Sequence, residues 1–467
     1  MSEIVAWSAV ETVARLKARD VSAEEVCRAH LQRLETVNPE LNAVVDDVPD
    51  AIERARAIDA GNVPRGILHG APITTKINTD QDGLASTNGL PGLAQNIAPG
   101  DSAVIANFKA AGAVIVGRTN TPEMSLRWCT SNPLHGTSLN PWDTSATPGG
   151  SSGAAAAAVA TGIGVIAHGN DVGGSVRYPA YCCGVAGLRP SLGRVPAYNP
   201  SAPSRSPIFA AMSVQGPIAR SVADVALGLE AMRSYNANDP LWSPAAASAR
   251  TRRDGPTRLG IAPTAFGGAE HPEVKAALSR ATDAAREAGM TIVEVDAPEI
   301  PRICEIWGQM LFTEVDLTSS DMIANMGSPE LNRWLDAFSD HFGKLDLAGY
   351  VQAVTDRITM QRAWANMFED IDALLLPTSL IPPFENDLDF KAPERAGELI
   401  KAQAPLYVVN LLGLPSLALP THVASGLPIG VQIVGPMHDD DAILEMGLQL
   451  ERELGRVLDQ MPERFRL

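Results

Sequence analysis

The sequence predicts an α/β protein: a single large α/β/α domain with a mixed β-sheet core covered by helices. Two observations predict this fold class. Helix-like and strand-like segments alternate from one end of the chain to the other, and neither an internal repeat nor a long linker interrupts them. The chain has 467 residues and is 45% hydrophobic, which is enough to bury a sizeable core. We therefore expect residues 1–467 to form one domain.

The first half of the chain carries helix and strand signals in alternation. Ser22 and Glu25 form a capping-box pattern that predicts the start of a helix. Further along, the sequence predicts a helix, a buried strand, a glycine-serine turn with an alanine-rich helix, and another strand, at 102–112, 113–120, 148–163 and 164–171. Surface loops are expected at 195–207 and 238–256, because both stretches are rich in turn-forming residues.

The second half continues the alternation. Residues 271–289 predict a helix with Pro272 near its first position and Gly289 as its cap, followed by a strand in TIVEVDAP. Residues 302–370 read as mostly helical and carry the aromatic residues Trp307, Phe312, Trp334, Phe338 and Trp364. Late strands are expected at 373–378, 416–423 and 429–435.

Composition limits the classes of partner. The net charge of −17 and the pI of about 4.9 disfavour nucleic acid or an anionic membrane surface as the main partner. No stretch of about 18 apolar residues lacks charges, so no transmembrane helix is expected. Five cysteines without a C-x-x-C pattern argue against a disulfide framework, and the N-terminus shows no signal peptide. We expect a cytoplasmic protein.

Three short motifs are candidates for chemistry: Lys76 in PITTKIN, Ser151 and Ser152 in PGGSSGA, and Ser175 in DVGGSVR. Each alone would usually be an ordinary turn or surface position. Other chemistries fail on sequence, because the chain contains no Walker A loop, no S-x-x-K and no H-E-x-x-H. The histidines are scattered, so we expect neither a metal site nor a cofactor.

One competing motif stays open. Gly149, Ser151 and Gly153 match the G-x-S-x-G elbow of α/β-hydrolases, with His422 or His438 as a possible base. That elbow needs a strand running directly into the serine. The preceding residues, NPWDTSATPGG, contain two prolines and no apolar run, so the sequence favours this interpretation less.

Read together, the three motifs resemble the amidase signature family. The match comprises PITTKIN, PGGSSG about 75 residues later, GNDVGGSVRYPA and GVAGLRPSLGRVP, with flanking matches such as GRTNTPE, QGPIARSVADVA and GLPIGVQIVG. The resemblance covers nearly the whole chain and thins between about 240 and 370. It implies the amidase signature fold, with a catalytic core at 65–235 and a variable helical insertion at 240–370 that contributes to the substrate pocket.

The resemblance also implies a catalytic set. Ser175 would be the nucleophile, Ser151 a bridging serine and Lys76 the base, with a cis peptide bond between Gly150 and Ser151. The neighbouring Ser152 would support this turn.

The residue types suit this assignment. A serine hydroxyl needs a base within hydrogen-bond reach, and lysine is a base only when burial lowers its pKa. Lys76 lies among Ile73, Thr74, Thr75 and Ile77, which suits a desolvated amine. His168, although only seven residues before Ser175, is then not needed as a base and is expected to face the core or support the loop.

An oxyanion hole is expected from the peptide N–H groups of Val172, Gly173, Gly174 and Ser175, because glycines let the backbone approach a substrate carbonyl. Asp171 would hold this turn through backbone or Arg177 hydrogen bonds; a plain turn-capping aspartate and a structural arginine are the alternatives.

The chain departs from the family pattern at three positions. Ile77 stands where an aspartate usually follows the lysine, Ala154 replaces a glycine, and Asn170 replaces a threonine. The resulting AHGND is similar to the cyclic-amide hydrolases of the family. None of these changes removes a residue of the implied catalytic set.

The resemblance implies an amidohydrolase of the acylamide type, acting through an acyl-enzyme on a small linear or cyclic amide, or on a related carbamate or ester. The alternatives are a glutaminase-type subunit of a tRNA-dependent amidotransferase and a catalytically silent scaffold. A monomer or homodimer is expected. Residues that we expect to line the substrate pocket are Trp128, Cys129, Tyr178, Phe209, Trp307, Met310 and Phe312.

Overall fold

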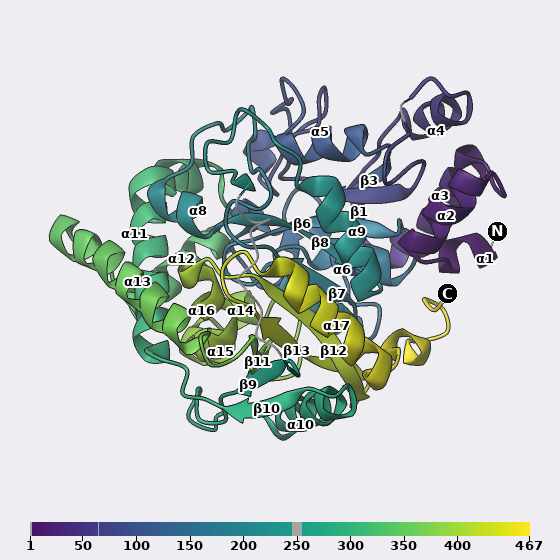
Figure 1. Cartoon of the computed structure of the whole chain (residues 1–467). Coiled ribbons are helices and arrows are strands. Elements are labelled where there is room, and N and C mark those ends of the chain that lie inside the picture. Colours follow the sequence, from purple (N-terminus) through teal and green to yellow (C-terminus); the bar gives the residue numbers. More distant parts are fainter. Residues whose placement is uncertain (1, 64, 245–254) are drawn as a thin grey trace.

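The computed structural model describes residues 2–63, 65–244 and 255–467. A large mixed sheet runs through the centre of the molecule, with helices on its two faces (Figure 1). In the described part of the chain the sheet has eleven strands, in the spatial order β1 (Val44–Asp46), β3 (Val114–Thr119), β2 (Pro72–Lys76), β6 (Ile166–Asp171), β8 (Val214–Ala219), β7 (Ala186–Arg189), β12 (Ser416–Ala424), β13 (Leu427–Val434), β11 (Ala373–Pro377), β9 (Arg258–Ile261) and β10 (Thr291–Glu294).

Parallel and antiparallel pairs are combined in this sheet. β3, β2 and β6 run parallel to one another, as do β11, β9 and β10, whereas the strands from β6 through β8, β7, β12 and β13 to β11 pair antiparallel. The register pairs Ile73 with Ile166 and Thr74 with Ala167. Because β2 and β6 are parallel neighbours, their carboxyl ends meet at one edge, and Lys76 comes to lie beside the end of β6.

Two groups of helices cover the middle of the sheet. α6 (Gly153–Ala160) and α7 (Arg177–Cys183) pack against each other and on one face, while α9 (Val222–Met232), α10 (Pro272–Glu287) and α17 (Asp440–Leu454) pack together on the other. Alternation along β6 shows the two faces. Ile166 contacts Gly228 of α9, whereas a side chain at Gly169, three residues on, would meet Ser152 and Val176.

The remaining helices surround this core. They are α1 (Ser2–Ala6), α2 (Ala9–Ala18), α3 (Ala23–Leu41), α4 (Ala51–Asp59), α5 (Ala103–Ala110), α8 (Pro207–Met212), α11 (Ile300–Met326), α12 (Pro329–Phe342), α13 (Leu347–Met367), α14 (Leu388–Lys391), α15 (Ala396–Ala402) and α16 (Ala404–Leu412). Short 3₁₀ turns lie at Pro91–Leu93, Glu123–Ser125, Pro393–Arg395 and Val457–Gln460, and a small separate hairpin joins β4 (Ser131–Asn132) to β5 (Gly136–Thr137).

The predicted fold class is confirmed, because a mixed sheet lies between helices on both faces. Local signals also located elements. Ser22 caps α3 with a complete capping box, and Pro272 begins α10. The segment 240–370 contains the strands β9 and β10, which extend the sheet and are joined by α10, before the consecutive helices α11, α12 and α13. The expected loop at 195–207 ends where α8 begins, and residues 245–254 of the other expected loop lie outside the described residues.

None of the described helices combines the length and the apolar character that crossing a membrane would require.

The contact between α11 and α12 depends on a glycine. A Cβ atom added at Gly308 of α11 would lie 2.0 Å from Cδ1 of Phe342 in α12. We expect Gly308→Ala to destabilise the protein, because overpacking of about 1–3 kcal/mol outweighs the roughly 1 kcal/mol that alanine gains in helix propensity. The thermal midpoint should fall by about 1–2 °C, because a chain of 467 residues unfolds with a large entropy change. Ser320→Ala, at an exposed position of the same helix, is the control. A Gly308→Ala midpoint equal to or above that of the wild type would contradict this packing.

Candidate active site

Lys76 is the last residue of β2, and its side chain is completely buried. Its Nζ lies 2.6 Å from Oγ of Ser151 and 2.9 Å from Oδ1 of Asn170. Burial lowers the pKa of Lys76 well below its ordinary value, and the nearby charge of Asp171 only partly opposes this. An amine of this kind is available as a base at a pH where an exposed lysine is protonated.

Ser151 lies on the tight turn that leads into α6. The peptide bond between Gly150 and Ser151 is cis, as the resemblance implies. A side chain at Gly150 would lie 2.3 Å from the carbonyl oxygen of Arg127, so only glycine fits this approach of two backbones. The turn therefore brings the Ser151 hydroxyl to Lys76 although 75 residues separate them in sequence.

Ser175 follows the end of β6 and precedes α7. Its side chain is 5% exposed and borders a cavity. The amide of Ser152 donates a hydrogen bond of 3.2 Å to the carbonyl oxygen of Ser175, which ties the two serine turns together. The structure thus places the three predicted residues in one region: Lys76 and Ser151 in direct contact, and Ser175 on the turn bonded to the residue after Ser151.

Asp171 holds the turn that carries Ser175. Its carboxylate accepts hydrogen bonds from the amides of Gly174 and Val176, at 3.0 and 3.1 Å, and from the guanidinium of Arg177 at 3.1 Å. Burial alone would raise the pKa of Asp171, but the charges of Arg177 and Arg189 outweigh it and hold that pKa below its usual range. Asp171 is thus a buried, ionised anchor.

Arg177 connects this anchor to distant parts of the chain. Its guanidinium also donates to Gln432 of β13 at 2.8 Å, and to the Leu406 carbonyl and Asn410 of α16 at 2.9 and 2.7 Å. Arg177 and Asp171 form a salt bridge whose members are both fully buried. The arginine therefore fixes the start of α7 against two elements of the C-terminal part.

The predicted oxyanion-hole amides fall into two groups. The N–H of Gly174 points to Oδ1 of Asp171 and is already used. Among the hydrogen bonds of the described residues, none uses the N–H groups of Val172, Gly173 or Ser175. Those three amides are the available donors, and Gly174 serves the turn instead.

A cavity adjoins Ser175, and its walls are apolar and aromatic. It holds only about 20 Å³, which is room for roughly one water molecule. Three of the predicted pocket residues line it: Trp128, Trp307 and Phe312. The other lining residues are Ser125, Leu126, Val172, Gly173, Leu311, Trp334 and Phe338, so no charged side chain of the described residues borders it.

The other four predicted pocket residues are not among the lining residues of this cavity. Tyr178 is buried and stacks on Tyr181 and Phe384. Met310 is buried in the core, and Phe209 packs half-buried on α8. Cys129 lies close to Asp387 and Asp389, whose carboxylates accept hydrogen bonds from the guanidinium of Arg127.

Three polar residues near Lys76 were not predicted as site residues. Asn170 accepts a hydrogen bond from Lys76, and its amide donates to Asn78 at 3.0 Å. Asn78 in turn donates to the hydroxyl of Ser125 at 2.9 Å, and Ser125 borders the cavity. A chain of hydrogen bonds therefore links the amine of Lys76 to the cavity wall. The only sequence signal was that Asn170 departs from the family pattern.

The alternative elbow at Ser151 lacks its structural setting. The residues leading into Ser151 form no strand. His422 lies 3.5 Å from Glu273 and within 2.9 Å of Thr421, while His438 donates its amide to Ser191. The hydroxyl of Ser151 faces a lysine amine rather than either histidine.

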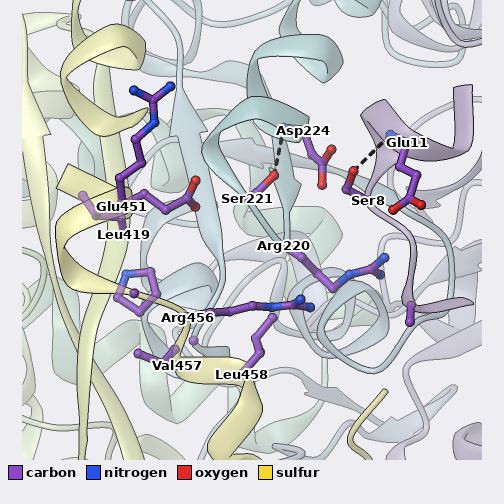
Figure 2. Close-up of a pocket in the computed structure, with 15 residues that line it drawn as sticks. Ser8, Glu11, Arg220, Ser221, Asp224, Leu419, Glu451, Arg456, Val457 and Leu458 are labelled. Carbon is purple, nitrogen blue, oxygen red and sulfur yellow. Dashed lines mark hydrogen bonds between the residues drawn. The ribbon is translucent and has the colours of Figure 1, made fainter. Parts of the chain in front are cut away.

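Figure 2 shows a different, larger cavity of about 440 Å³ beside Arg220, Asp224 and Glu451. Ser8 and Ser221, the serines at its edge, accept hydrogen bonds from the amides of Glu11 and Asp224 and cap the starts of α2 and α9. None of the predicted catalytic residues lines it.

Comparisons with known proteins agree with this geometry. Residues 25–444 match the Amidase family. The chain is 41% identical over 456 aligned positions to an indoleacetamide hydrolase of Bradyrhizobium diazoefficiens, covering 96% of this chain and 87% of that one. It is 32% identical to a glutamyl-tRNA(Gln) amidotransferase subunit of a Synechococcus species, covering 94% and 90%. Among solved structures, a bacterial aryl acylamidase superimposes with a TM-score of 0.83 at 26% identity, over 96% of each chain.

His168 gives a test of the core beneath this site. The ring is fully buried, its Nε2 lies 2.7 Å from Oε1 of Gln215, and its Nδ1 accepts a hydrogen bond from the Lys76 amide at 3.4 Å. Burial, with a smaller contribution from Lys76, lowers the pKa of His168 to about 4. The folded state thus favours neutral histidine, so this contribution to stability is present above about pH 6.5 and is lost as the pH falls towards 4.

We expect the wild type to lose about 2 kcal/mol of unfolding free energy through His168 between pH 7.5 and pH 5. His168→Gln keeps a donor and an acceptor but cannot titrate. Urea unfolding at the two pH values should show a pH dependence smaller by that amount in the variant. Equal pH dependence in the two proteins would refute the buried neutral ring.

Proposed function

The chain belongs to the amidase signature family and is an amide-hydrolysing enzyme, and from this premise we propose that its substrate is a small aryl amide, with a primary arylacetamide as first candidate. The observation that carries the proposal is the cavity at Ser175, walled by Trp128, Trp307 and other aromatic rings. Aromatic walls suit an aryl group by stacking and by apolar burial. The 41% identity to a protein named indoleacetamide hydrolase supports the same class.

We propose that Ser175 attacks the amide carbonyl carbon while its proton passes through Ser151 to the neutral amine of Lys76. The 2.6 Å contact of Lys76 with Ser151 supports the second half of this relay. The tetrahedral intermediate then expels the amine, which takes the proton back, and an acyl-enzyme ester remains on Ser175. Water, deprotonated by the same relay, cleaves that ester to the carboxylic acid and restores the serine.

Asn170 is compatible with the neutral form of the base. Its Oδ1 is an acceptor, so a neutral amine directs one N–H towards it at 2.9 Å and its lone pair towards the Ser151 hydroxyl. Ile77 follows Lys76 where the family usually has an aspartate, and an apolar neighbour adds no negative charge that would stabilise the protonated amine. Both departures from the family pattern are therefore compatible with a lysine base.

The glutaminase alternative finds less support. A glutaminase-type subunit is represented among the relatives at 32% identity. Free glutamine carries an ammonium and a carboxylate that need charged or hydrogen-bonding partners. Ser125 and Ser175 are the hydroxyl-bearing residues that line the cavity, and none of its lining residues among those described is charged. This lining favours an apolar acyl group.

We also propose that the enzyme acts in the cytoplasm, on a small molecule rather than on nucleic acid or a membrane, as a monomer or homodimer. The five cysteines are unpaired, which suits a reducing compartment. One side of α13 exposes Leu347, Val351, Val354 and Ile358 at intervals of four, three and four residues. Such spacing places the four side chains on one face and is compatible with contact between two copies.

Substrate class is tested by measuring kcat/KM on a panel: indole-3-acetamide, phenylacetamide, acetanilide, glutamine and a cyclic diamide. We expect the two arylacetamides to exceed glutamine and the cyclic diamide by at least about tenfold, since burying an aryl group is worth several methylene equivalents. The product acid is quantified for every substrate, together with the ammonia that the primary amides release and the aniline that acetanilide releases. Glutamine or the cyclic amide as the best substrate would overturn the proposed class.

The catalytic set is tested with Lys76→Ala and Ser175→Ala, which should each lower kcat/KM by at least about 10³-fold. In the wild type, kcat/KM should rise with pH as the amine loses its proton and level off below the ordinary lysine range, because burial lowers the pKa of Lys76. Lys109→Ala, which removes a surface lysine paired with Asp101, is the control and should keep full activity. Hydrolysis retained in Lys76→Ala would rule out the base.

A further inference from the structure

The turn that carries the free amides is rich in glycine, so the orientation of its peptide planes is not fixed by the chain itself. Val172, Gly173 and Gly174 form two successive peptide units, and glycine lets such units rotate at little cost. An oxyanion hole requires donors that already point at the developing charge before the reaction. Something other than the glycines must therefore hold the orientation of these peptide planes.

Two tryptophans from distant segments hold them. Nε1 of Trp307, on α11, donates a hydrogen bond of 3.0 Å to the carbonyl oxygen of Val172. Nε1 of Trp128 donates one of 3.0 Å to the carbonyl oxygen of Gly173. Both side chains are buried, at 4% and 6% exposure; the hydrogen bond to Gly173 is fully buried and the one to Val172 is partly buried.

The two bonds have different consequences because a trans peptide points its carbonyl and the following N–H in opposite directions. Trp128 fixes the unit whose N–H belongs to Gly174, and that N–H is bonded to Asp171 at 3.0 Å. Both the carbonyl and the N–H of that peptide unit are therefore already hydrogen-bonded. Trp307 fixes the unit whose N–H belongs to Gly173, which is one of the free amides. Trp307 thus sets the direction of an available oxyanion donor.

The indole of Trp307 is itself held in place. It stacks on Tyr407 of α16 with ring centroids 4.4 Å apart and planes 15° from parallel. The hydroxyl of Tyr407 donates to the Ile400 carbonyl. The indole also lies so close to Gly173 that a side chain there would meet Cζ2 of Trp307 at 2.8 Å. The ring therefore has one position in which its N–H reaches Val172.

We propose that Trp307 is a positioning residue that orients the Gly173 N–H as an oxyanion donor, with Trp128 holding the adjoining peptide unit. This inference rests on the proposed acyl-enzyme chemistry at Ser175. It adds a second role for a cavity wall, because Trp307 borders the space for the acyl group and also holds the backbone that stabilises its oxyanion. The rate of acylation then depends on the N–H of Trp307, and not only on the shape of its ring.

The test compares Trp307→Phe with Trp334→Phe. Trp334 lines the same cavity, and its Nε1 is buried without a hydrogen-bond partner among the described residues, so its loss breaks no such bond. For Trp307→Phe we expect kcat on the best amide to fall roughly 10–100-fold while KM stays within about twofold, because the lost interaction acts in the transition state. Trp334→Phe should change kcat far less. Equal losses of kcat in the two variants, or an unchanged kcat in Trp307→Phe, would overturn the proposal.

A second readout separates oxyanion stabilisation from general damage. An aryl trifluoromethyl ketone forms a hemiketal oxyanion with a serine, whereas the arylacetate product does not. Trp307→Phe should weaken binding of the ketone by the same factor as kcat and leave that of the arylacetate unchanged. Parallel loss of both affinities would assign Trp307 to the pocket wall alone. If the phenylalanine variant does not fold, Trp307→3-benzothienylalanine removes the N–H while keeping the ring size.

A wrong substrate class can be distinguished from a wrong role for Trp307. If the wild type ignores arylacetamides, the same variants are compared by the burst of p-nitrophenol from p-nitrophenyl phenylacetate, which reports acylation of Ser175. A burst slowed much more in Trp307→Phe than in Trp334→Phe supports the positioning role whatever the natural amide is. Release of p-nitrophenol that is as fast in Ser175→Ala as in the wild type overturns both the nucleophile and the inference built on it.

Discussion

The buried ion pair of Asp171 and Arg177 is the interaction on which the rest of the site depends. Neither residue touches water, and such a pair is tolerated only when hydrogen bonds satisfy the remaining polar atoms. Hydrogen bonds satisfy both groups in this structure. The Asp171 carboxylate accepts from backbone amides of its own turn, and the Arg177 guanidinium donates to Asn410, Gln432 and a backbone carbonyl. The pair thereby fixes the Ser175 turn against α16 and β13, which come from the other end of the chain. Removing Asp171 would leave Arg177 buried without its counter-charge, and removing Arg177 would leave Asp171 with only the more distant Arg189, 3.7 Å away.

The sheet supplies the second constraint. β2 and β6 are parallel neighbours, so the residue that ends one strand meets the residues that end the other. Lys76 is therefore buried beside Asn170 and Asp171 by register, although almost a hundred residues lie between them. The same register buries His168 under Lys76, where it accepts the lysine amide and pairs with Gln215. The position of Lys76 at the end of β2 therefore buries its amine and lowers its pKa. The carboxyl ends of strands are also where ligands bind in many α/β sheets.

Local helix and strand signals in the sequence predicted the fold class, whereas the grouping of Lys76, Ser151 and Ser175 was implied by the resemblance to the amidase signature family and not by any one of the three motifs. The sequence predicted fewer of the residues that line the cavity. Trp334 and Phe338 carry no local signal beyond helical spacing, and they reach the cavity only because α12 packs on α11. Likewise, Leu311 rather than Met310 borders the cavity, a difference that depends on how α11 is rotated about its axis. The Gly174 amide was expected as an oxyanion donor, but its bond to Asp171 is visible only in three dimensions.

The side chains that wall the small cavity at Ser175 differ in how firmly they are held. An arylacetamide needs far more room than about 20 Å³, so aromatic side chains must move when it binds. Trp128 and Trp307 are each held by an N–H···O bond and by stacking on Tyr407, and moving them would release the peptide units of the oxyanion turn. Trp334 has no partner for its buried N–H among the described residues, so displacing it breaks no such bond. Moving Trp334 would lose its stacking on Phe338 but no hydrogen bond of its indole N–H, whereas moving Trp307 would release the peptide unit that directs the Gly173 donor at the developing charge.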